Sequence, residues 1–340
     1  MTDNNEALPP HAQLMQMAMG QIVSRVLYAA AKLGLADEIA TGPKDAAELA
    51  AALGAHAPSL HRLMRMLAMV GVLTEGPEQR FALTPLGEAL KTGAPGSVRT
   101  VLIVAGAPFF QCMYEDIEYS VRTGKPGFDK VQGMPIFEYL SQHPEDMSLF
   151  SELMVAFHGP ETDAVASSYD FSTFETIVDV GGATGNMLAA ILTRYPRPRG
   201  VLYDLPHVVS EAPALLQAKG VMDRVAIEPG DLFKAVPSGG DAYILSHIIH
   251  DWREDLCLTI LGNCRKAMKL DSKLLIVEAV IPDGDVPHPG KMMDIVMLMQ
   301  TGGQERSETE YRALLDKAGF QLTRIVPTPS LASVVEARLA

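Results

Sequence analysis

Hydrophobic positions in the first quarter of the chain follow a helical period. Between residues 11 and 90, apolar residues recur at intervals of three and four, which places them on one face of an α-helix. Asp45 followed by Glu48 matches a capping box and predicts the start of a short helix. A second helix is predicted to begin at Ser59, and the segment 72–84 then shows two short strands around a turn. Two helices and a β-hairpin in this order predict a winged helix-turn-helix.

The hydrophobic period changes near Thr176. Short apolar or β-branched runs then alternate with helical stretches, which predicts a parallel sheet with crossover helices. The last two runs lie only a few residues apart, so they cannot enclose a helix and are predicted to pair antiparallel at one end of the sheet. The predicted strands are 176–180, 200–204, 224–228, 241–246, 273–280, 321–326 and 332–339. We therefore expect an α/β fold, with a doubly wound, Rossmann-like sheet of seven strands.

The length and composition limit the classes of protein to consider. The 340 residues allow two domains, and we expect an N-terminal helical and winged-helix domain at 1–100, a helical connector at 101–175 and the sheet domain at 176–340. The net charge is −13, from 28 basic and 41 acidic residues, whereas a nucleic-acid binder needs a local surplus of Lys and Arg. The winged helix is therefore better interpreted as a packing or dimerisation module.

Neither a membrane span nor a disulfide framework is expected. The longest nearly apolar run, residues 101–110, is far shorter than the roughly 20 residues of a membrane span, and the N-terminus lacks the features of a secretory signal. The three cysteines are odd in number and show no metal-ligand spacing, which is typical of a reducing cytoplasm. We expect a cytoplasmic protein without a metal ion.

The strongest local motif is IVDVGGATG, which begins at Ile177. An apolar strand ends in Asp179, and a turn with Gly181, Gly182 and Gly185 leads into a helix. Glycines let the backbone approach a ligand at the carboxyl end of a strand. The motif is neither a Walker A loop nor the G-x-G-x-x-G of a dinucleotide site. A tight strand-to-helix turn that binds nothing is the structural alternative.

Two further acidic residues follow the next two strands. Asp204 lies about 20 residues after the glycine turn, where a ribose-binding carboxylate is expected. The alternative is structural, because the following Leu205 and Pro206 resemble the start of a helix. Asp231, in the sequence PGDLF, can accept the adenine amino group while Leu232 covers the ring. Three acids at the ends of three successive strands predict a site for a nucleoside without a pyrophosphate.

Taken together, six motifs resemble one protein family. The combination is similar to the class I S-adenosylmethionine-dependent O-methyltransferases, namely the caffeic-acid type of plants and the antibiotic-tailoring type of bacteria. The resemblance covers nearly the whole chain. It implies S-adenosylmethionine as cofactor, S-adenosylhomocysteine as product, and a homodimer formed through the N-terminal domain. The motifs are VDVGGATG, LYDLPHVV, PGDLF, HDW, VEAVIP and GGQERSETEYRALLDKAGF.

The resemblance also implies roles for individual residues. His250 would be the general base, with Glu278 and Glu305 flanking its imidazole. The cofactor would be held by Asp179, Gly181, Gly182, Gly185, Asp204, Leu205, Gly230, Asp231, Leu232 and Ser246. The acceptor pocket would be lined by Phe150, Met154, His158, Asp251, Met297 and Thr301.

Some positions depart from the plant enzymes. Ser246 stands where they carry a lysine near the cofactor, and Ala183 replaces a glycine of the loop. His158 and Thr301 differ from the plant pocket residues, so a phenylpropanoid acceptor does not carry over to this chain.

Several of these residues also have a purely structural interpretation. Asp251 and Ser307 are each followed three residues later by a glutamate, which predicts a capping box and a helix start at both places. Met297 lies in a methionine-rich helix, whose side chains can form part of the hydrophobic core. His247, three residues before His250, is a rival for the role of base.

The sequence therefore predicts methyl transfer to a hydroxyl group of a small aromatic acceptor. A phenol becomes a good nucleophile as it loses its proton, and a histidine with a pKa near 6.5 can accept that proton. The alternatives are an N- or C-methyltransferase, or a family member that no longer methylates. A winged-helix DNA-binding regulator and a nicotinamide-dependent reductase are disfavoured by the charge and by the glycine pattern.

Overall fold

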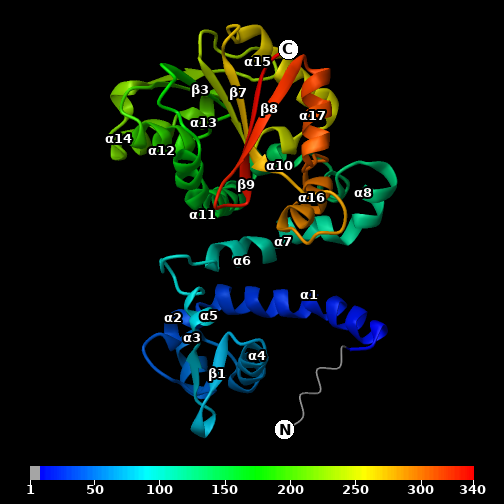
Figure 1. The fold of residues 1–340 in the computed structure, drawn as a ribbon. Helices are drawn as coiled ribbons and strands as arrows, with labels where there is room; N and C mark the ends of the chain where they lie inside the picture. Colours follow the sequence, from blue (N-terminus) through cyan, green and yellow to red (C-terminus); the bar gives the residue numbers. More distant parts are fainter. Residues whose placement is uncertain (1–7) are drawn as a thin grey trace, which may run out of the picture. The chain divides into compact units, whose positions relative to one another are not determined.

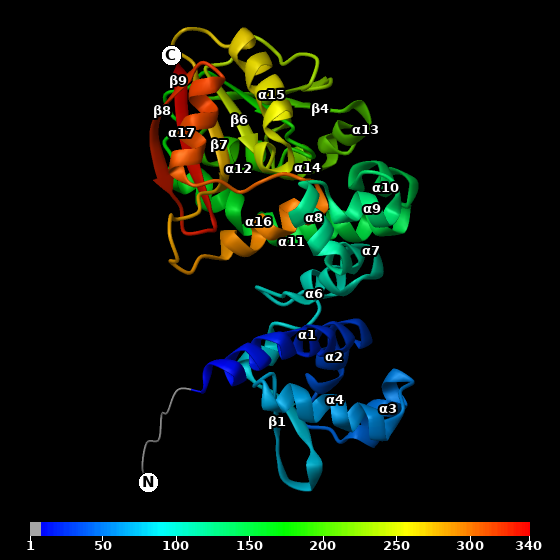
Figure 2. The same cartoon turned by 90° about the vertical axis from the view of Figure 1, so that its right-hand side faces the viewer.

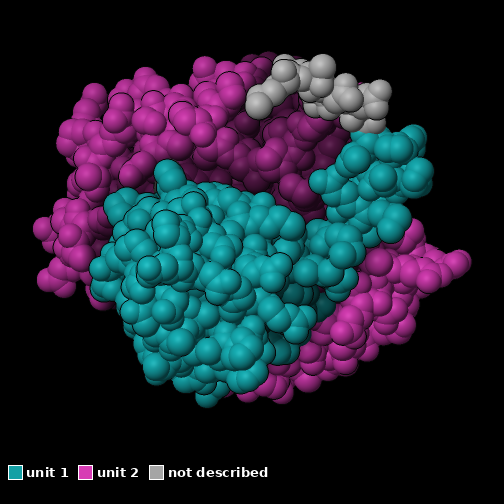
Figure 3. All heavy atoms as spheres, turned by 90° about the horizontal axis from the view of Figure 1, so that it is seen from below, with its two compact units in different colours: residues 1–111, 145–156 teal, residues 112–144, 157–340 magenta. Residues whose placement is uncertain are grey.

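The structure is a computed structural model that describes residues 8–340. It divides into two compact units, which Figure 3 shows in different colours. The helical unit extends to residue 111 and includes residues 145–156, and the sheet unit comprises residues 112–144 and 157–340. This partition differs from the one expected from the sequence, whose domain boundaries stay a prediction.

In the helical unit, both the capping box and the hairpin that the sequence predicts are present. The Asp45 carboxylate accepts a hydrogen bond from the N–H of Glu48 at 2.9 Å, and the Glu48 carboxylate accepts one from the N–H of Asp45. The two strands of the hairpin pair antiparallel. The elements are α1 (Pro10–Leu33), α2 (Leu35–Ile39), α3 (Ala46–Leu53), α4 (Ala57–Met69), β1 (Leu73–Glu75), η1 (Pro77–Gln79), β2 (Phe81–Leu83), α5 (Pro85–Glu88), α6 (Arg99–Gly106) and α7 (Pro108–Gln111).

The start of α4 differs from the prediction. The helix begins at Ala57 rather than at Ser59, and His56 is its N-cap residue. Pro58 lies in the first turn, where its fixed φ angle suits the helix and its missing N–H leaves no hydrogen bond unmade. Ser59 is already inside the helix, with its hydroxyl 3.0 Å from Nδ1 of His56. The proline therefore sets this helix start.

The sheet unit is built on seven strands in the order β5-β4-β3-β6-β7-β9-β8 (Figure 1). The strands are β3 (Thr176–Val180), β4 (Arg199–Asp204), β5 (Val225–Pro229), β6 (Ala242–Ser246), β7 (Lys273–Ala279), β8 (Phe320–Pro327) and β9 (Ala332–Leu339). The first five are parallel, and β9 runs antiparallel to β7 and β8. The predicted α/β sheet with a closing antiparallel pair is confirmed.

Helices cover both faces of the sheet (Figures 1 and 2). One face packs against α12 (Asn186–Arg194) and α14 (Ala212–Ala218), and the other against α15 (Glu254–Ala267) and α17 (Glu308–Lys317). Consecutive strand residues point to opposite faces, so Ile177 belongs to the first core and Val178 to the second. The other elements are η2 (Cys112–Asp116), α8 (Ile117–Thr123), α9 (Gly127–Gln132), α10 (Ile136–Gln142), α11 (Pro144–Ser168), α13 (Pro206–Val209), η3 (Met222–Arg224), η4 (Ile249–Asp251) and α16 (Pro289–Gln300).

The topology places the loops of interest at one edge of the sheet. The carboxyl ends of five parallel strands meet there, and the direction of the strand order reverses beside β3. In open α/β sheets, ligands bind at this edge next to such a reversal. In residues 8–340, no helix is both long enough and apolar enough to span a membrane.

The central strand β6 offers a direct test of the sheet core. Ile244 is fully buried between β3 and β7, so Ile244→Ala leaves a cavity and is expected to lower the free energy of unfolding by about 2–5 kcal/mol. Urea unfolding followed by the fluorescence of Trp252, the single tryptophan, reports on the sheet unit. Leu270→Ala is the control, because Leu270 is 92% exposed. Equal effects of both variants would contradict this packing.

Candidate active site

His250 and Glu305 form a buried pair at the carboxyl edge of the sheet. His250 follows β6 in the short 3-10 helix η4 and is 7% exposed. Its Nδ1–H donates a hydrogen bond to Oε1 of Glu305 at 2.8 Å. Oδ1 of Asp251 lies 3.9 Å from the other ring nitrogen, Nε2. With Nδ1 held by a carboxylate, Nε2 is the nitrogen left to accept a proton.

Glu278, which was expected to flank the imidazole, bonds to the backbone beside the ring and to Tyr311. Its Oε1 accepts three hydrogen bonds, from the N–H groups of Ile248 at 3.1 Å, Ile249 at 2.6 Å and His250 at 3.0 Å. Its Oε2 accepts one from the hydroxyl of Tyr311 at 2.5 Å. Glu278 therefore fixes the backbone of η4 and so the place of the histidine. The sequence analysis missed Tyr311, which has no local motif.

The loop before α17 carries Glu305 to the ring. The N–H of Gln304 donates to the carbonyl of His250 at 2.8 Å, and the N–H of Glu305 donates to Asp294 at 2.9 Å. A Cβ atom on Gly303 would lie 1.8 Å from the carbonyl oxygen of His250, so only glycine allows this approach. The predicted capping box at Ser307 is present and fixes the start of α17.

The second predicted capping box, from Asp251 to Glu254, is absent. Helix α15 begins at Glu254, and its N-cap is Arg253, whose side chain makes no capping bond. Asp251 instead belongs to η4, the turn that Glu278 holds. This turn keeps the Asp251 carboxylate beside the imidazole rather than at the helix end.

The charges around His250 raise its pKa. Burial alone would lower it, but the hydrogen bond to Glu305 and the carboxylates of Asp251 and Glu278 outweigh burial and raise the pKa to about 10. Burial also raises the pKa of Asp251 to about 6, against the opposing effect of His250. The site therefore stabilises a positive charge on the imidazole.

The glycine loop after β3 needs its glycines. Gly181 and Gly185 have φ angles of 73° and 85°, in the left-handed region that favours glycine. A Cβ on Gly181 would lie 2.4 Å from the side chain of Ile248 and 3.5 Å from that of Leu232. A Cβ on Gly182 would lie 2.6 Å from the Asp179 carboxyl. The loop is therefore packed directly against the residues that precede His250.

Acidic side chains surround this loop. Asp204 accepts hydrogen bonds from the N–H groups of Ala183 at 2.9 Å and Leu205 at 2.7 Å. Asp179 is fully buried, and neither of its carboxyl oxygens has a partner among the described residues. Burial, together with repulsion from Asp204, raises the pKa of Asp179 to about 7. An unpaired buried carboxyl is a site for a ligand with a donor or a positive charge.

The other predicted cofactor residues lie at the ends of neighbouring strands. Asp231 accepts from the N–H of Phe233 at 3.0 Å and pairs with Lys234 at 3.1 Å, so part of its capacity is already used. The N–H of Gly230 donates to the carbonyl of Asp204 at 2.8 Å. Ser246 is half-buried at the end of β6.

The predicted acceptor residues come from both units. Phe150 and Met154 lie on the part of α11 that belongs to the helical unit, so their role stays a prediction. Met297 is buried on α16, and Thr301 ends that helix with its hydroxyl bonded to the carbonyl of Met297 at 3.1 Å. In the sheet unit, the ring of His158 lies 3.8 Å from that of His247.

A pair that the sequence analysis missed lies next to His250. Nε2 of His247 is 2.5 Å from Oε1 of Glu161 on α11. The sequence analysis treated His247 only as a rival base and did not consider Glu161. The one local signal is that Glu161 follows His158 by three residues, which puts both on one face of the helix.

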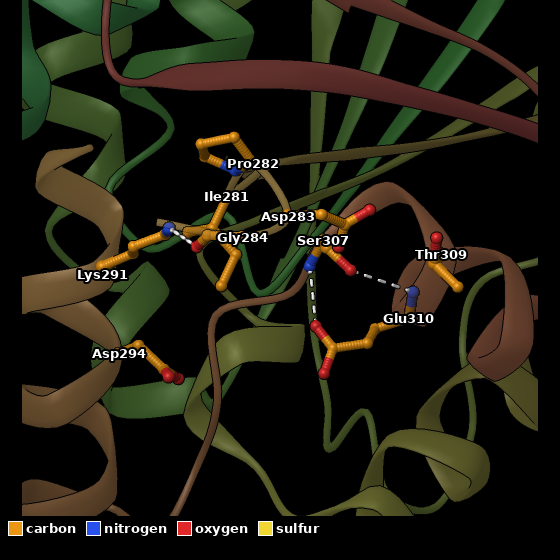
Figure 4. A pocket seen from close by; sticks show the side chains of 9 residues that line it. All are labelled: Ile281, Pro282, Asp283, Gly284, Lys291, Asp294, Ser307, Thr309 and Glu310. Carbon is orange, nitrogen blue, oxygen red and sulfur yellow. Dashed lines mark hydrogen bonds between the residues drawn. The ribbon is translucent and has the colours of Figure 1, made fainter. Parts of the chain in front are cut away.

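A hollow of about 480 Å³ opens near the start of α17 (Figure 4). Figure 4 shows the Ser307–Glu310 capping box within its lining and Lys291 bonded to the carbonyl of Gly284. None of the predicted site residues lines it. The lining residues are Ile281, Pro282, Asp283, Gly284, Lys291, Asp294, Ser307, Thr309 and Glu310.

Two protein-family models match the chain. Residues 114–321 match an O-methyltransferase domain, and residues 15–93 match an O-methyltransferase dimerisation domain. The chain is 44% identical to phenazine O-methyltransferase PhzM of Lysobacter antibioticus, over 99% of both chains. It is 36% identical to 8-amino-8-demethylriboflavin N,N-dimethyltransferase of Streptomyces davaonensis, over 96% of this chain and 94% of that one.

A solved structure is similar over almost the whole chain. It is the O-methyltransferase NcsB1 from neocarzinostatin biosynthesis, in complex with S-adenosylmethionine and 2-hydroxy-5-methyl naphthoic acid. The TM-score is 0.83 at 32% sequence identity, over 94% of this chain and 96% of that chain.

The histidine–carboxylate pair predicts the direction of a pKa change. In Glu305→Gln, the imidazolium of His250 loses its buried hydrogen-bonded anion, so the pKa of His250 is expected to fall. Titration of ¹³C-labelled histidine by NMR measures it, with the His250 signal assigned through its loss in His250→Ala. The exposed Asp285→Asn is the control and should leave the pKa of His250 unchanged. An unaltered pKa in Glu305→Gln would mean that the pair does not hold in solution.

Proposed function

Since this chain belongs to the family of class I S-adenosylmethionine-dependent O-methyltransferases, we propose that it methylates a phenolic hydroxyl of a small aromatic acceptor. The observation that carries the proposal is the buried hydrogen bond between His250 and Glu305 beside the glycine loop. When bound, S-adenosylmethionine would supply a methyl group from its positively charged sulfur, with S-adenosylhomocysteine as the product. The hydroxyl oxygen takes the methyl group, and Nε2 of His250 takes the proton.

The residues around the glycine loop fit this cofactor. The unpaired carboxyl of Asp179 can accept from a cationic amino group, which also supports its ionised form. Each oxygen of Asp204 holds one backbone N–H and keeps a lone pair for a ribose hydroxyl. Leu232 and Ile248, both packed near Gly181, offer apolar surface to an adenine ring.

The charge of the site governs how His250 acts. With a pKa of about 10, its imidazole is protonated near neutral pH in the free protein. A nearby positive charge lowers the pKa of a histidine, so cofactor binding favours the neutral, basic form. A positioned base of this kind contributes about 10²–10⁴-fold to a rate. We expect the rate of methyl transfer to rise with pH over the range in which His250 loses its proton.

The base also favours oxygen over nitrogen as the acceptor atom. A relative in the family is an N,N-dimethyltransferase, so the family includes both reactions. A neutral aromatic amine already carries its reactive lone pair, whereas a phenol needs to lose a proton as it attacks. A buried histidine held by Glu305 serves the second reaction.

The same family membership supports a homodimer through the helical unit. Several large apolar side chains on α1 are exposed in the single chain, and isolated proteins seldom leave such a group uncovered. Leu14 is 68% exposed and Met17 is 72% exposed, and their spacing of three puts them on one face of the helix. We propose that this face is part of the interface between subunits.

Replacement of the base should abolish fast turnover but not cofactor binding. His250→Ala is expected to lower kcat by about 10²–10⁴-fold toward a phenolic acceptor, because the nitrogen that takes the proton in the proposed reaction is removed. Calorimetric titration with S-adenosylmethionine should give an affinity within a few-fold of the parent protein. His56→Ala, at an exposed site in the helical unit, is the control. Unchanged turnover in His250→Ala would remove His250 from the mechanism.

The proposed subunit interface can be tested by introducing negative charges on the exposed face of α1. Leu14→Glu combined with Met17→Glu is expected to convert a dimer into a monomer of 36.7 kDa, because carboxylates are poorly tolerated in a buried interface. Light scattering after size exclusion measures the mass. Leu270→Glu, on the exposed surface of the sheet unit, is the control. A dimer that survives the double substitution would place the interface elsewhere.

A further inference from the structure

A second histidine–carboxylate pair lies beside the first. Nε2 of His247 is 2.5 Å from Oε1 of Glu161, and Nδ1 of His158 is 3.9 Å from the same oxygen. The ring centroids of His158 and His247 are 3.8 Å apart, and those of His247 and His250 are 5.1 Å apart. Three imidazoles therefore adjoin one another, and the pair formed by His250 and Glu305 involves only one of them.

This cluster contains polar atoms that the protein itself does not satisfy. Nδ1 of His158 and Nδ1 of His247 are buried and have no hydrogen-bond partner among the described residues. His247 also has a φ angle of 53°, in the left-handed region that a residue with a side chain rarely adopts. Unpaired buried nitrogens on a strained residue are typical of a binding site rather than of a core.

The geometry favours hydrogen bonding over metal binding. Ligand atoms lie about 2.0–2.2 Å from a zinc ion, so two of them on one tetrahedral ion stand roughly 3.4 Å apart. Here the distances are 2.5 Å between His247 and Glu161, which suits a direct hydrogen bond, and 3.9 Å from His158 to the same carboxylate. His247 is therefore oriented by Glu161 in the way that His250 is oriented by Glu305.

We propose that His247, held by Glu161 and flanked by His158, binds a second hydroxyl group of the aromatic acceptor, next to the hydroxyl that is methylated. The proposal rests on the proposed function and names its substrate class. If Nε2–H of His247 donates to Glu161, Nδ1 is free to accept from a hydroxyl. The short separation of His247 and His250 suits oxygens on adjacent or peri carbons.

The charge of the cluster selects a neutral group. Burial, together with the neighbouring His247 and His250, lowers the pKa of His158 to about 2, so His158 is uncharged. Glu161 is 5% exposed, and its carboxylate disfavours a second anion nearby. The site therefore fits a hydroxyl rather than a carboxylate as the second group.

Matched acceptors test the proposal. 2,3-Dihydroxynaphthalene should be methylated with a kcat/KM about tenfold or more above that of 2-naphthol, which corresponds to one good hydrogen bond. In Glu161→Gln and His247→Leu the ratio should approach one, because the KM for the diol rises toward that for 2-naphthol. Glu211→Gln, at an exposed site of the sheet unit, is the control and should keep the preference.

Binding without turnover separates this proposal from the proposed function. Calorimetry in the presence of S-adenosylhomocysteine should show tighter binding of the diol than of 2-naphthol, and Glu161→Gln should remove the difference. Selective binding without methylation would leave the second-hydroxyl site standing and overturn the proposed reaction. Equal or absent binding of both naphthols, a preference for 3-hydroxy-2-naphthoate, or tight Zn²⁺ binding that both variants lose would each overturn the second-hydroxyl site.

Discussion

His250 and Glu305 are both buried and lie 2.8 Å apart, and this pair determines how the segments around it are held. Such a pair is stable only if each partner is held in place, because a single unpaired buried charge is strongly destabilising. Glu278 fixes the backbone around His250 by accepting hydrogen bonds from three N–H groups. The absence of a side chain at Gly303 lets the loop that carries Glu305 come close to the carbonyl of His250. The glycine loop packs on the same turn through Ile248, so cofactor loop and base form one packed unit.

The sequence predicts the sheet well because its signals are local. Each strand is a short run of apolar or β-branched residues, and the antiparallel ending follows from the short distance between the last two runs. The capping boxes at Asp45 and Ser307 are confirmed, since both residues directly precede their helices. The same rule is wrong at Asp251 because a contact 28 residues away, from Glu278 to the N–H of His250, holds that segment as a separate turn. A tertiary hydrogen bond thus overrides a local pattern.

The site is predictable only where its members share a motif. The glycine loop and the HDW triplet can be recognised in the chain, and in the structure Ile248, two residues before His250, packs beside Gly181. The pair of Glu161 and His247 spans 86 residues, and neither position has a pattern that points to the other. The role of Glu278 is of the same kind, since the sequence places it on the right edge of the sheet but does not tell a ring contact from a backbone contact.

The acidic surroundings of His250 serve the site both before and after transfer. In the proposed reaction one positive charge leaves the sulfur, and one arrives on the imidazole, so the net charge of the site does not change. The carboxylates of Glu305, Asp251 and Glu278 stabilise a positive charge at the imidazole, which favours the product side of the proton transfer. The same negative surroundings attract the cationic cofactor beforehand. The same carboxylates can therefore stabilise the positive charge on the cofactor before transfer and on the imidazole after it, because that charge moves only a short distance.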